Sequence, residues 1–362
     1  MGLLEHFGAS SASGLASLRL AQCEYNAGHD AVALEAFSRT QERYPGSPYA
    51  TEAKRGTELA LYRLAASANG DSVLSQLLEQ YPTSAFAADA LLQIGKRHYQ
   101  AKRWSEAAED FRQVVSRFPA SASADQAQFL MADALAQSGA ADEAKLAYEQ
   151  FLGYFPQSEL KSTVSFRLGL LRFASKEYMQ AAVAFTTALE DSAPPEVSAP
   201  ARYNLALCER QLGELEQARA DLERYTREFP AGALAGQAAF QLADLDEAAG
   251  QLTLAQSGFA AVLEHSPAPA LQAEAAFRLG RCREQLQDVP GAMRAYAVAR
   301  SCPDLDQPYR LSALARLAAL HESRREYTRA VEAYRDIIHH SKDRELTAAA
   351  EDRVSQLSPH SH

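Results

Sequence analysis

The sequence of 362 residues predicts an all-α protein, a solenoid of about nine helical hairpins with one further helix covering its C-terminal end. Three observations carry this prediction. Prolines recur at an almost constant interval, each interval holds two stretches with helical apolar spacing, and small residues return at two fixed positions within it. One such hairpin leaves an apolar face uncovered, so only stacking against the next hairpin buries that face.

The prolines set the length of the repeat. Pro45, Pro82, Pro119 and Pro156 are each 37 residues apart, and the series continues at intervals of 36 to 38 residues with Pro194, Pro230, Pro267 and Pro303. We therefore expect one solenoid domain over residues 1–347. Its nine units are 14–50, 51–87, 88–124, 125–161, 162–198, 199–235, 236–272, 273–310 and 311–347. Residues 348–362, which begin with an amphipathic stretch, are expected to form the capping helix and the tail.

Each unit contains two predicted helices, which we name helix A and helix B. In the third unit Leu91 and Ile94 lie on one face of helix A, and Phe111 and Val114 mark helix B. The segment YPTS at 81–84 is an example of the predicted joint between units. Proline cannot continue a helix, and a serine side chain can accept a hydrogen bond from the free amides of the next helix. We expect this role for Ser47, Ser84 and Ser121.

Small residues predict how the two helices of a unit meet. One position of helix A is Gly or Ala in seven units, namely Gly95, Ala132, Gly169, Ala206, Ala243, Gly280 and Ala318. A position of helix B is Ala in the same units, and a large residue four places later is expected to fill the space toward the neighbouring unit. The second unit departs from this pattern, with Glu58 and Gly70 where small packing residues are expected.

Composition excludes several classes of function. The net charge is -10 and no run of Lys or Arg exceeds two residues, which argues against nucleic acid as a partner. No stretch reaches the roughly 18 to 20 apolar residues of a membrane span. No catalytic, phosphate-binding, metal-binding or cofactor-binding motif is present, so we expect no enzyme activity and no cofactor.

The cysteines indicate packing rather than chemistry. Cys23, Cys208 and Cys282 occupy the same position of their units, and no pair has the spacing of a zinc or redox site. We expect small buried residues with reduced thiols, and for Trp104, the single tryptophan, packing over its own hairpin. The N-terminus MGLLEHFGASSASG does not show the basic n-region and long h-region of a signal peptide, and it falls almost directly on a repeat. We expect a periplasmic or envelope-associated protein if a targeting segment has been removed, and otherwise a cytoplasmic one.

These positions resemble the tetratricopeptide repeat. The resemblance rests on Leu-Gly or Leu-Ala in helix A, Ala and then an aromatic residue in helix B, and a late proline. The (Y/F)-P-x-S joint together with AAFRLG at 275–280 is similar to the subgroup found in bacterial envelope proteins, such as the Tol-Pal cell-division coordinator and the outer-membrane assembly lipoprotein. The resemblance implies a right-handed superhelical solenoid in which helices A line a concave groove.

The same resemblance implies that the second, fifth, ninth and twelfth positions of helix A point into this groove. The aromatic candidates for partner binding are Tyr99, Phe129, Phe166, Tyr203, Phe240 and Phe277, and the charged candidates are Lys96, Asp133, Asp244, Glu247, Arg278 and Arg281. Two interpretations remain open for each set. The aromatic residues either pack between adjacent helices A or grip a peptide, and the charges either form a solvated face or select a partner of mixed charge.

The resulting hypothesis is a non-catalytic scaffold that binds a protein or peptide partner in a bacterial envelope complex. The alternative is a cytoplasmic regulatory module of a larger signalling protein, which four reduced cysteines would suit. A homo-oligomer through exposed repeat ends is a further expectation, since such ends can stack on another copy.

Overall fold

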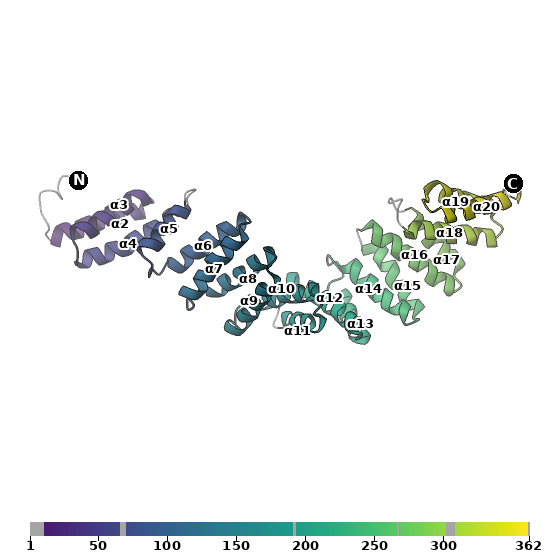
Figure 1. Ribbon diagram of the computed structural model, residues 1–362, viewed down its shortest axis with the longest axis horizontal. Coiled ribbons are helices and arrows are strands. Elements are labelled where there is room, and N and C mark those ends of the chain that lie inside the picture. The colour runs from purple at the N-terminus through teal and green to yellow at the C-terminus, as the bar shows by residue number, and fades with distance from the viewer. Residues whose placement is uncertain (1–10, 66–69, 191–192, 266–267, 302–307, 361–362) are drawn as a thin grey trace. The chain divides into compact units, whose positions relative to one another are not determined.

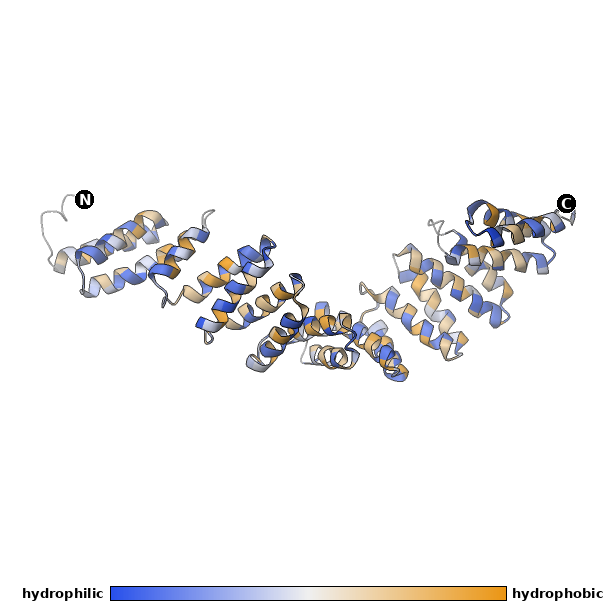
Figure 2. Ribbon diagram, viewed as in Figure 1, coloured by the Kyte–Doolittle hydropathy of each residue, from blue (hydrophilic) through white to orange (hydrophobic). Residues whose placement is uncertain are grey.

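The computed structural model describes residues 11–65, 70–190, 193–265, 268–301 and 308–360. Within these ranges the chain is built of α-helices and one short 3₁₀ turn, and it contains no strand, which confirms the all-α class. The chain divides into two compact units, Met1–Leu171 and Arg172–His362. Figure 1 labels the helices of both units. Each helix carries both hydrophilic and hydrophobic residues (Figure 2), as expected for helices that bury one side.

The described residues of the first compact unit form nine helices, the last of which runs just past the boundary of the unit. Their bounds are α2 (Ser11–Asn26), α3 (Asp30–Arg43), α4 (Pro48–Leu64), α5 (Gly70–Gln80), α6 (Ala87–Gln100), α7 (Trp104–Arg117), α8 (Ala124–Gln137), α9 (Ala141–Tyr154) and α10 (Lys161–Ala174). Consecutive helices from α2 to α9 pack against each other.

The second compact unit continues the same alternation of helices A and B. Its helices are α11 (Tyr178–Ala188), α12 (Pro195–Leu212), α13 (Leu215–Glu228), α14 (Ala235–Ala248), α15 (Leu252–His265), α16 (Pro269–Gln285), α17 (Val289–Arg300), α18 (Pro308–Ser323), α19 (Tyr327–His340) and α20 (Arg344–Leu357). A 3₁₀ turn, η1 (Ser358–His360), follows. Helix α20 packs on α19 and places Ala350 against Ile337, as predicted for a capping helix.

The joints between hairpins are closed by the backbone. The Ser84 amide donates to the carbonyl of Tyr81 at 2.9 Å, and the Ala87 amide donates to the carbonyl of Ser84 at 3.0 Å. The first of these bonds closes a turn with proline at its second position, where proline is favoured. The same pair of backbone bonds recurs at the joints that begin with Tyr44, Phe118, Phe155 and Phe229.

The serine side chain matters less in these joints than predicted. Ser47 does accept from the Ala50 amide at 3.2 Å, and Ser84 accepts from the Phe86 amide at 3.2 Å, just before α6 begins. For Ser121 the prediction is wrong, because its buried hydroxyl has no hydrogen-bond partner among the described residues. Gly232 makes the same turn with no hydroxyl at all, so backbone geometry is sufficient.

A left-handed residue follows the end of helix A in most hairpins. Glycine occupies this place at Gly28, Gly139, Gly213 and Gly250, with φ between 75° and 87°. The equivalent residues of other units are Lys102, Lys176, Gln287 and Arg325, with φ between 58° and 64°. Because a side chain makes the left-handed region unfavourable, these four turns carry local strain that the glycine turns avoid.

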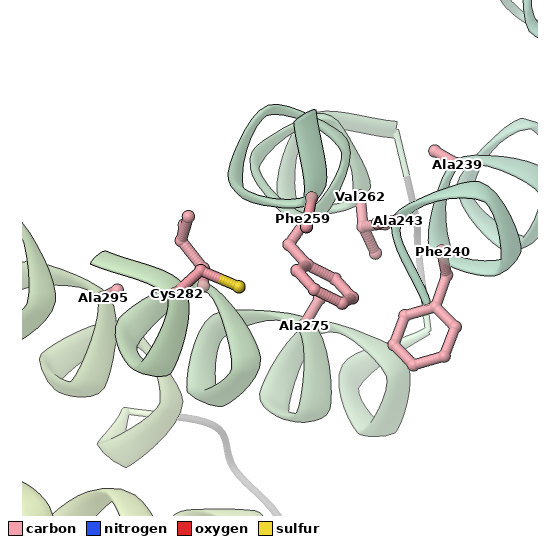
Figure 3. Packing of buried hydrophobic residues seen from close by; sticks show 10 residues of the cluster. Ala239, Phe240, Ala243, Phe259, Val262, Ala275, Cys282 and Ala295 are labelled. Carbon is pink, nitrogen blue, oxygen red and sulfur yellow. The ribbon is translucent and has the colours of Figure 1, made fainter. Parts of the chain in front are cut away.

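The small residue of helix A makes room for an aromatic ring of helix B. A Cβ added to Gly95 would lie 2.6 Å from the ring of Phe111 in the same hairpin. The ring also reaches the next hairpin, as Figure 3 shows for Phe259, which lies between Ala243 of its own hairpin and Ala275 of the following one. The large residue therefore packs toward its own helix A as well as toward the neighbouring unit.

The second unit departs from the pattern, as its sequence predicts. Helix α4 has 17 residues, and it buries Ala53, Gly56 and Ala60. Glu58 is half-buried instead, where its carboxylate accepts from the Ser84 hydroxyl at 2.8 Å. A Cβ on Gly56 would lie 2.4 Å from the ring of Phe37 in α3, and α4 packs more extensively on α3 than on α5.

The cysteines follow the prediction in part. Cys208 and Cys282 are buried and, like Cys23, carry free thiols. Cys23 is exposed, so the prediction of burial is wrong there. Phe259 of the preceding hairpin packs in one cluster with Cys282, whereas no described helix precedes α2. Cys302 lies outside the described residues. Trp104 packs edge-on against Tyr99 across its hairpin, with ring centroids 4.8 Å apart, as predicted.

Candidate protein-binding surface

Four of the five aromatic residues at the fifth position of helix A lie against helix B of their own hairpin. Ring centroids are 6.4 Å apart for Phe129 and Tyr148, 6.2 Å for Tyr203 and Tyr225, 5.6 Å for Phe240 and Phe259, and 5.8 Å for Phe277 and Tyr296. Phe277 also lies 5.8 Å from Tyr309 of the next helix A. Phe240 is buried, and the others, including Phe166, are half-buried.

These contacts change the first of the two open interpretations. One of the two interpretations was packing between adjacent helices A, but four of the five aromatic residues contact the ring of helix B in the same hairpin. A half-buried ring such as Tyr203 keeps one part accessible while another part is held by packing. Burial and the nearby Tyr225 raise the pKa of Tyr203, so its hydroxyl stays neutral at physiological pH.

In the first compact unit, Asp133 joins three helices. Its carboxylate accepts from the hydroxyl of Tyr99 on α6 and from that of Tyr148 on α9, the latter at 3.0 Å, while Arg167 on α10 lies 3.8 Å away. Only 8% of Asp133 is exposed. Burial, and then the hydrogen bond to Asp133, raise the pKa of Tyr99 to about 12. Lys96 donates to the side chain of Gln126 at 2.9 Å.

In the second compact unit, the predicted charged residues form one chain of ion pairs. Arg278 on α16 lies 2.5 Å from both Asp244 and Glu247 on α14, and Arg281 lies 3.7 Å from Glu247. Arg210 on α12 binds the other oxygen of Asp244. Burial alone would lower the pKa of Arg278, but its hydrogen bonds and charge interactions with the two carboxylates raise the pKa above its ordinary value.

Arg278 also stacks on aromatic rings. Its guanidinium lies 4.9 Å from the ring centre of Phe259 and 5.5 Å from that of Phe240. A cation over an aromatic face is held more strongly when water is excluded, and the Arg278 side chain is only 18% exposed. The aromatic and charged residues predicted for α14 and α16 therefore form one packed arrangement and not two separate features.

Comparisons with known proteins support the repeat architecture. Residues 85–257 match the profile of a family described as outer membrane lipoprotein. Residues 15–47 and 234–307 match two profiles described as tetratricopeptide repeat. The chain is a tetratricopeptide-repeat protein. No match was found among curated proteins.

Solved structures resemble parts of this tetratricopeptide-repeat protein at low identity. PilF of Pseudomonas aeruginosa is 19% identical over 59% of this chain and 90% of its own, with a TM-score of 0.45. PilW, a type IV pilus biogenesis factor, is 19% identical over 63% of this chain and 98% of its own, with a TM-score of 0.45. A tetratricopeptide repeat protein from Parabacteroides merdae is 14% identical over 75% of this chain and 98% of its own, with a TM-score of 0.46.

Further polar contacts of the tetratricopeptide-repeat protein were not predicted from its sequence. Arg316 on α18 binds Glu284 on α16 at 2.9 Å, and Arg353 on α20 binds Glu322 on α18. In these pairs, and in those of Arg210 and Arg278, the partners are 31 to 34 residues apart. The twelfth position of one helix A thus meets the sixth or ninth position of the next. A search of the sequence for opposite charges 31 to 34 residues apart could have found these pairs.

The described part of this tetratricopeptide-repeat protein also contains cavities, but no candidate metal site and no candidate membrane-spanning helix. Arg281 lines a cavity of about 330 Å³ together with Glu284 and Arg316. Among the described residues no group of three or more His, Cys, Asp or Glu side chains is arranged to hold a metal ion. No described helix is both long and apolar enough to cross a lipid bilayer.

Proposed function

We propose that this tetratricopeptide-repeat protein is a non-catalytic scaffold that binds a protein or peptide partner on the face formed by its helices A. One observation carries the proposal. Side chains of α12, α14 and α16 contact one another directly through Arg210, Asp244, Arg278 and Glu247, so successive helices A share one surface. Repeat proteins use such extended surfaces to bind partners.

Accessible groups on this face are suited to a polypeptide ligand. Tyr203 and Phe277 are half-buried, and the Arg281 side chain is 45% exposed at the edge of a cavity. Aromatic and arginine side chains contribute most of the binding energy in many protein interfaces. Polar contacts between neighbouring helices A support this face, and they involve Lys96, Tyr99, Asp133, Asp244, Glu247 and Arg278.

We further propose that the partner belongs to a bacterial cell-envelope complex. The match of residues 85–257 to an outer membrane lipoprotein family supports this location. The two buried cysteines do not favour the cytoplasmic alternative, because burial raises the pKa of Cys208 to about 12 and that of Cys282 to about 11. Such thiols remain protonated and unreactive in either compartment.

Photo-crosslinking in the native cell tests the proposed function. A photoreactive amino acid replaces Arg281 or Tyr203 on the helix-A face, and as control it replaces Glu223, which is exposed on helix B of the α12–α13 hairpin. Capture of one envelope protein from the helix-A positions alone supports the proposal. Capture only from Glu223 places binding on the opposite helices and contradicts it. Capture of a second copy of this chain would indicate self-association in place of a different partner.

A further inference from the structure

The divergent second hairpin creates a cavity in the first compact unit. A cavity of about 560 Å³ lies between α2 and α4, and its lining includes Arg19, Gln22 and Tyr25 of α2 and Arg55 and Leu59 of α4. In five later units the fifth position of helix A is aromatic, and in four of them the ring packs within its own hairpin. In the second unit this position is Arg55, whose side chain is exposed and leaves the space beside it unfilled.

The positive charge of this cavity is not neutralised within the described residues. Arg19 and Arg55 are both exposed, and neither forms an ion pair in the described part of the chain. Arg19 donates only to the neutral side chain of Gln22, at 2.9 Å. Gln22 in turn donates to Glu52, the acidic residue in the lining, at 3.0 Å. The lining therefore contains two guanidinium groups that form no ion pair with a described residue and one carboxylate, in a chain whose net charge is -10.

A second cavity adjoins the first and supplies an apolar wall. It measures about 430 Å³ and shares Tyr25 and Leu59 with the first cavity. The guanidinium of Arg63 covers the ring of Tyr25 at 3.6 Å and is paired with Asp30. Arg97, also in the lining, is paired with Asp71 at 2.6 Å. The cations of the second cavity are thus neutralised, which leaves Arg19 and Arg55 as the groups available to a ligand.

Charge and shape together indicate one class of ligand. Guanidinium groups recognise carboxylates through paired hydrogen bonds, and the shared wall of Tyr25 and Leu59 accepts an apolar side chain. We propose that α2 and α4 bind an acidic peptide segment of the partner protein, with its carboxylates on Arg19 and Arg55 and an apolar side chain against Leu59. This inference rests on the proposed scaffold function and names the chemistry of its ligand.

Binding of a defined peptide to the full chain tests this inference. The probe is a fluorescein-labelled peptide of alternating Glu and Leu residues, and its isostere carries Gln in place of Glu. Fluorescence anisotropy at low salt should show binding of the Glu peptide and at least tenfold weaker binding of the isostere. Arg19→Gln and Arg55→Gln should each weaken binding of the Glu peptide about tenfold. Arg294→Gln, at an exposed arginine on α17, is the matched control and should leave the affinity unchanged.

Several outcomes would overturn the inference. Equal affinity of the two peptides would show that the cavity does not recognise carboxylates. Unchanged affinity of both arginine variants for the Glu peptide would show the same. Displacement of the peptide by an equal concentration of inorganic phosphate would assign the arginines to a phosphate group instead. If these tests fail while crosslinking from Arg281 still captures a partner, the scaffold function stands and only the acidic-ligand inference is lost.

Discussion

Gly280 on α16 faces the ring of Tyr296 on α17, and replacing it with alanine should destabilise this hairpin. A Cβ at Gly280 would lie 2.4 Å from the ring, which is about 1 Å short of ordinary van der Waals contact. The ring cannot easily retreat. It is fully buried in a cluster with Ala276, Ala299 and Leu317, and its hydroxyl donates to Glu284 at 2.8 Å.

The expected cost follows from two opposing terms. Forcing one extra methyl group into a packed core costs about 2 to 3 kcal/mol when the neighbours cannot move. Alanine in place of glycine inside a helix returns about 1 kcal/mol. The net loss should therefore be about 1 to 2 kcal/mol for Gly280→Ala. Gly153→Ala on α9 is the matched control, because a Cβ there meets no atom within 4 Å. It should be neutral or stabilise by up to about 1 kcal/mol.

Urea unfolding followed by circular dichroism, with hydrogen exchange of the α16 and α17 amides, measures this difference. Repeat proteins can lose one junction before the rest, so the exchange rates identify where stability is lost. In a Tyr296→Leu background, Gly280→Ala should no longer destabilise, because the ring that it meets has been removed. Stabilisation by Gly280→Ala in the wild-type background, or an unchanged cost in the Tyr296→Leu background, would refute the steric reasoning.

Three further predictions follow from local geometry. Lys102→Gly should stabilise the first compact unit by about 0.5 to 1 kcal/mol because it relieves a left-handed backbone, whereas Gly139→Lys at the equivalent turn should destabilise it in urea unfolding. Burial, and then the charge of Asp221, raise the pKa of Glu209 from 4.5 to about 8. The neutral acid is therefore the favoured form in the fold, and the stability that this group contributes should fall as pH rises from 4.5 to 8. Glu209→Gln should remove this decline and raise stability at pH 8 by roughly 1 to 3 kcal/mol, and a pH series of unfolding curves with the same slope in both proteins would contradict it. In a Cys302→Ser background, iodoacetamide should alkylate exposed Cys23 in the native protein, while mass spectrometry should find no label on the two buried thiols, Cys208 and Cys282.

The helices and their turns were largely predictable because the same local sequence pattern recurs in successive units. Proline after an aromatic residue marks each joint, and small residues mark where the helices of a hairpin meet. The detail of each contact was less accessible. The hydroxyl of Ser121 has no capping role because the backbone already closes the turn. Cys23 is exposed although its sequence position matches that of Cys282, because burial depends on the preceding hairpin and not on the position alone.

The candidate surface was predicted by position but not by contact. Helical periodicity identifies which residues share a face with Asp244 and Arg278, but it does not state which residue of the next helix each one meets. That pairing depends on the offset between successive hairpins. Once the offset is known, the pair of Arg316 and Glu284 follows from sequence spacing. The second unit was recognised as divergent, yet the cavity beside Arg55 required the register of α4.

Whether a charged side chain already has an ion-pair partner determines the free energy that a ligand must spend to bind it. On α14 and α16 a ligand carboxylate that approaches Arg278 must displace Asp244 or Glu247, and each displaced carboxylate would remain partly buried without its partner. Leaving such a charge unpaired costs several kcal/mol. The new ion pair with the ligand is of the same kind as the one that is lost, so it gives no net gain. Arg19 and Arg55 have no such partner in the described part of the chain, so a ligand carboxylate there forms an ion pair without breaking one. The polar residues of α12 to α16 therefore act mainly as ties between hairpins, and the acidic ligand is expected at the α2–α4 cavity.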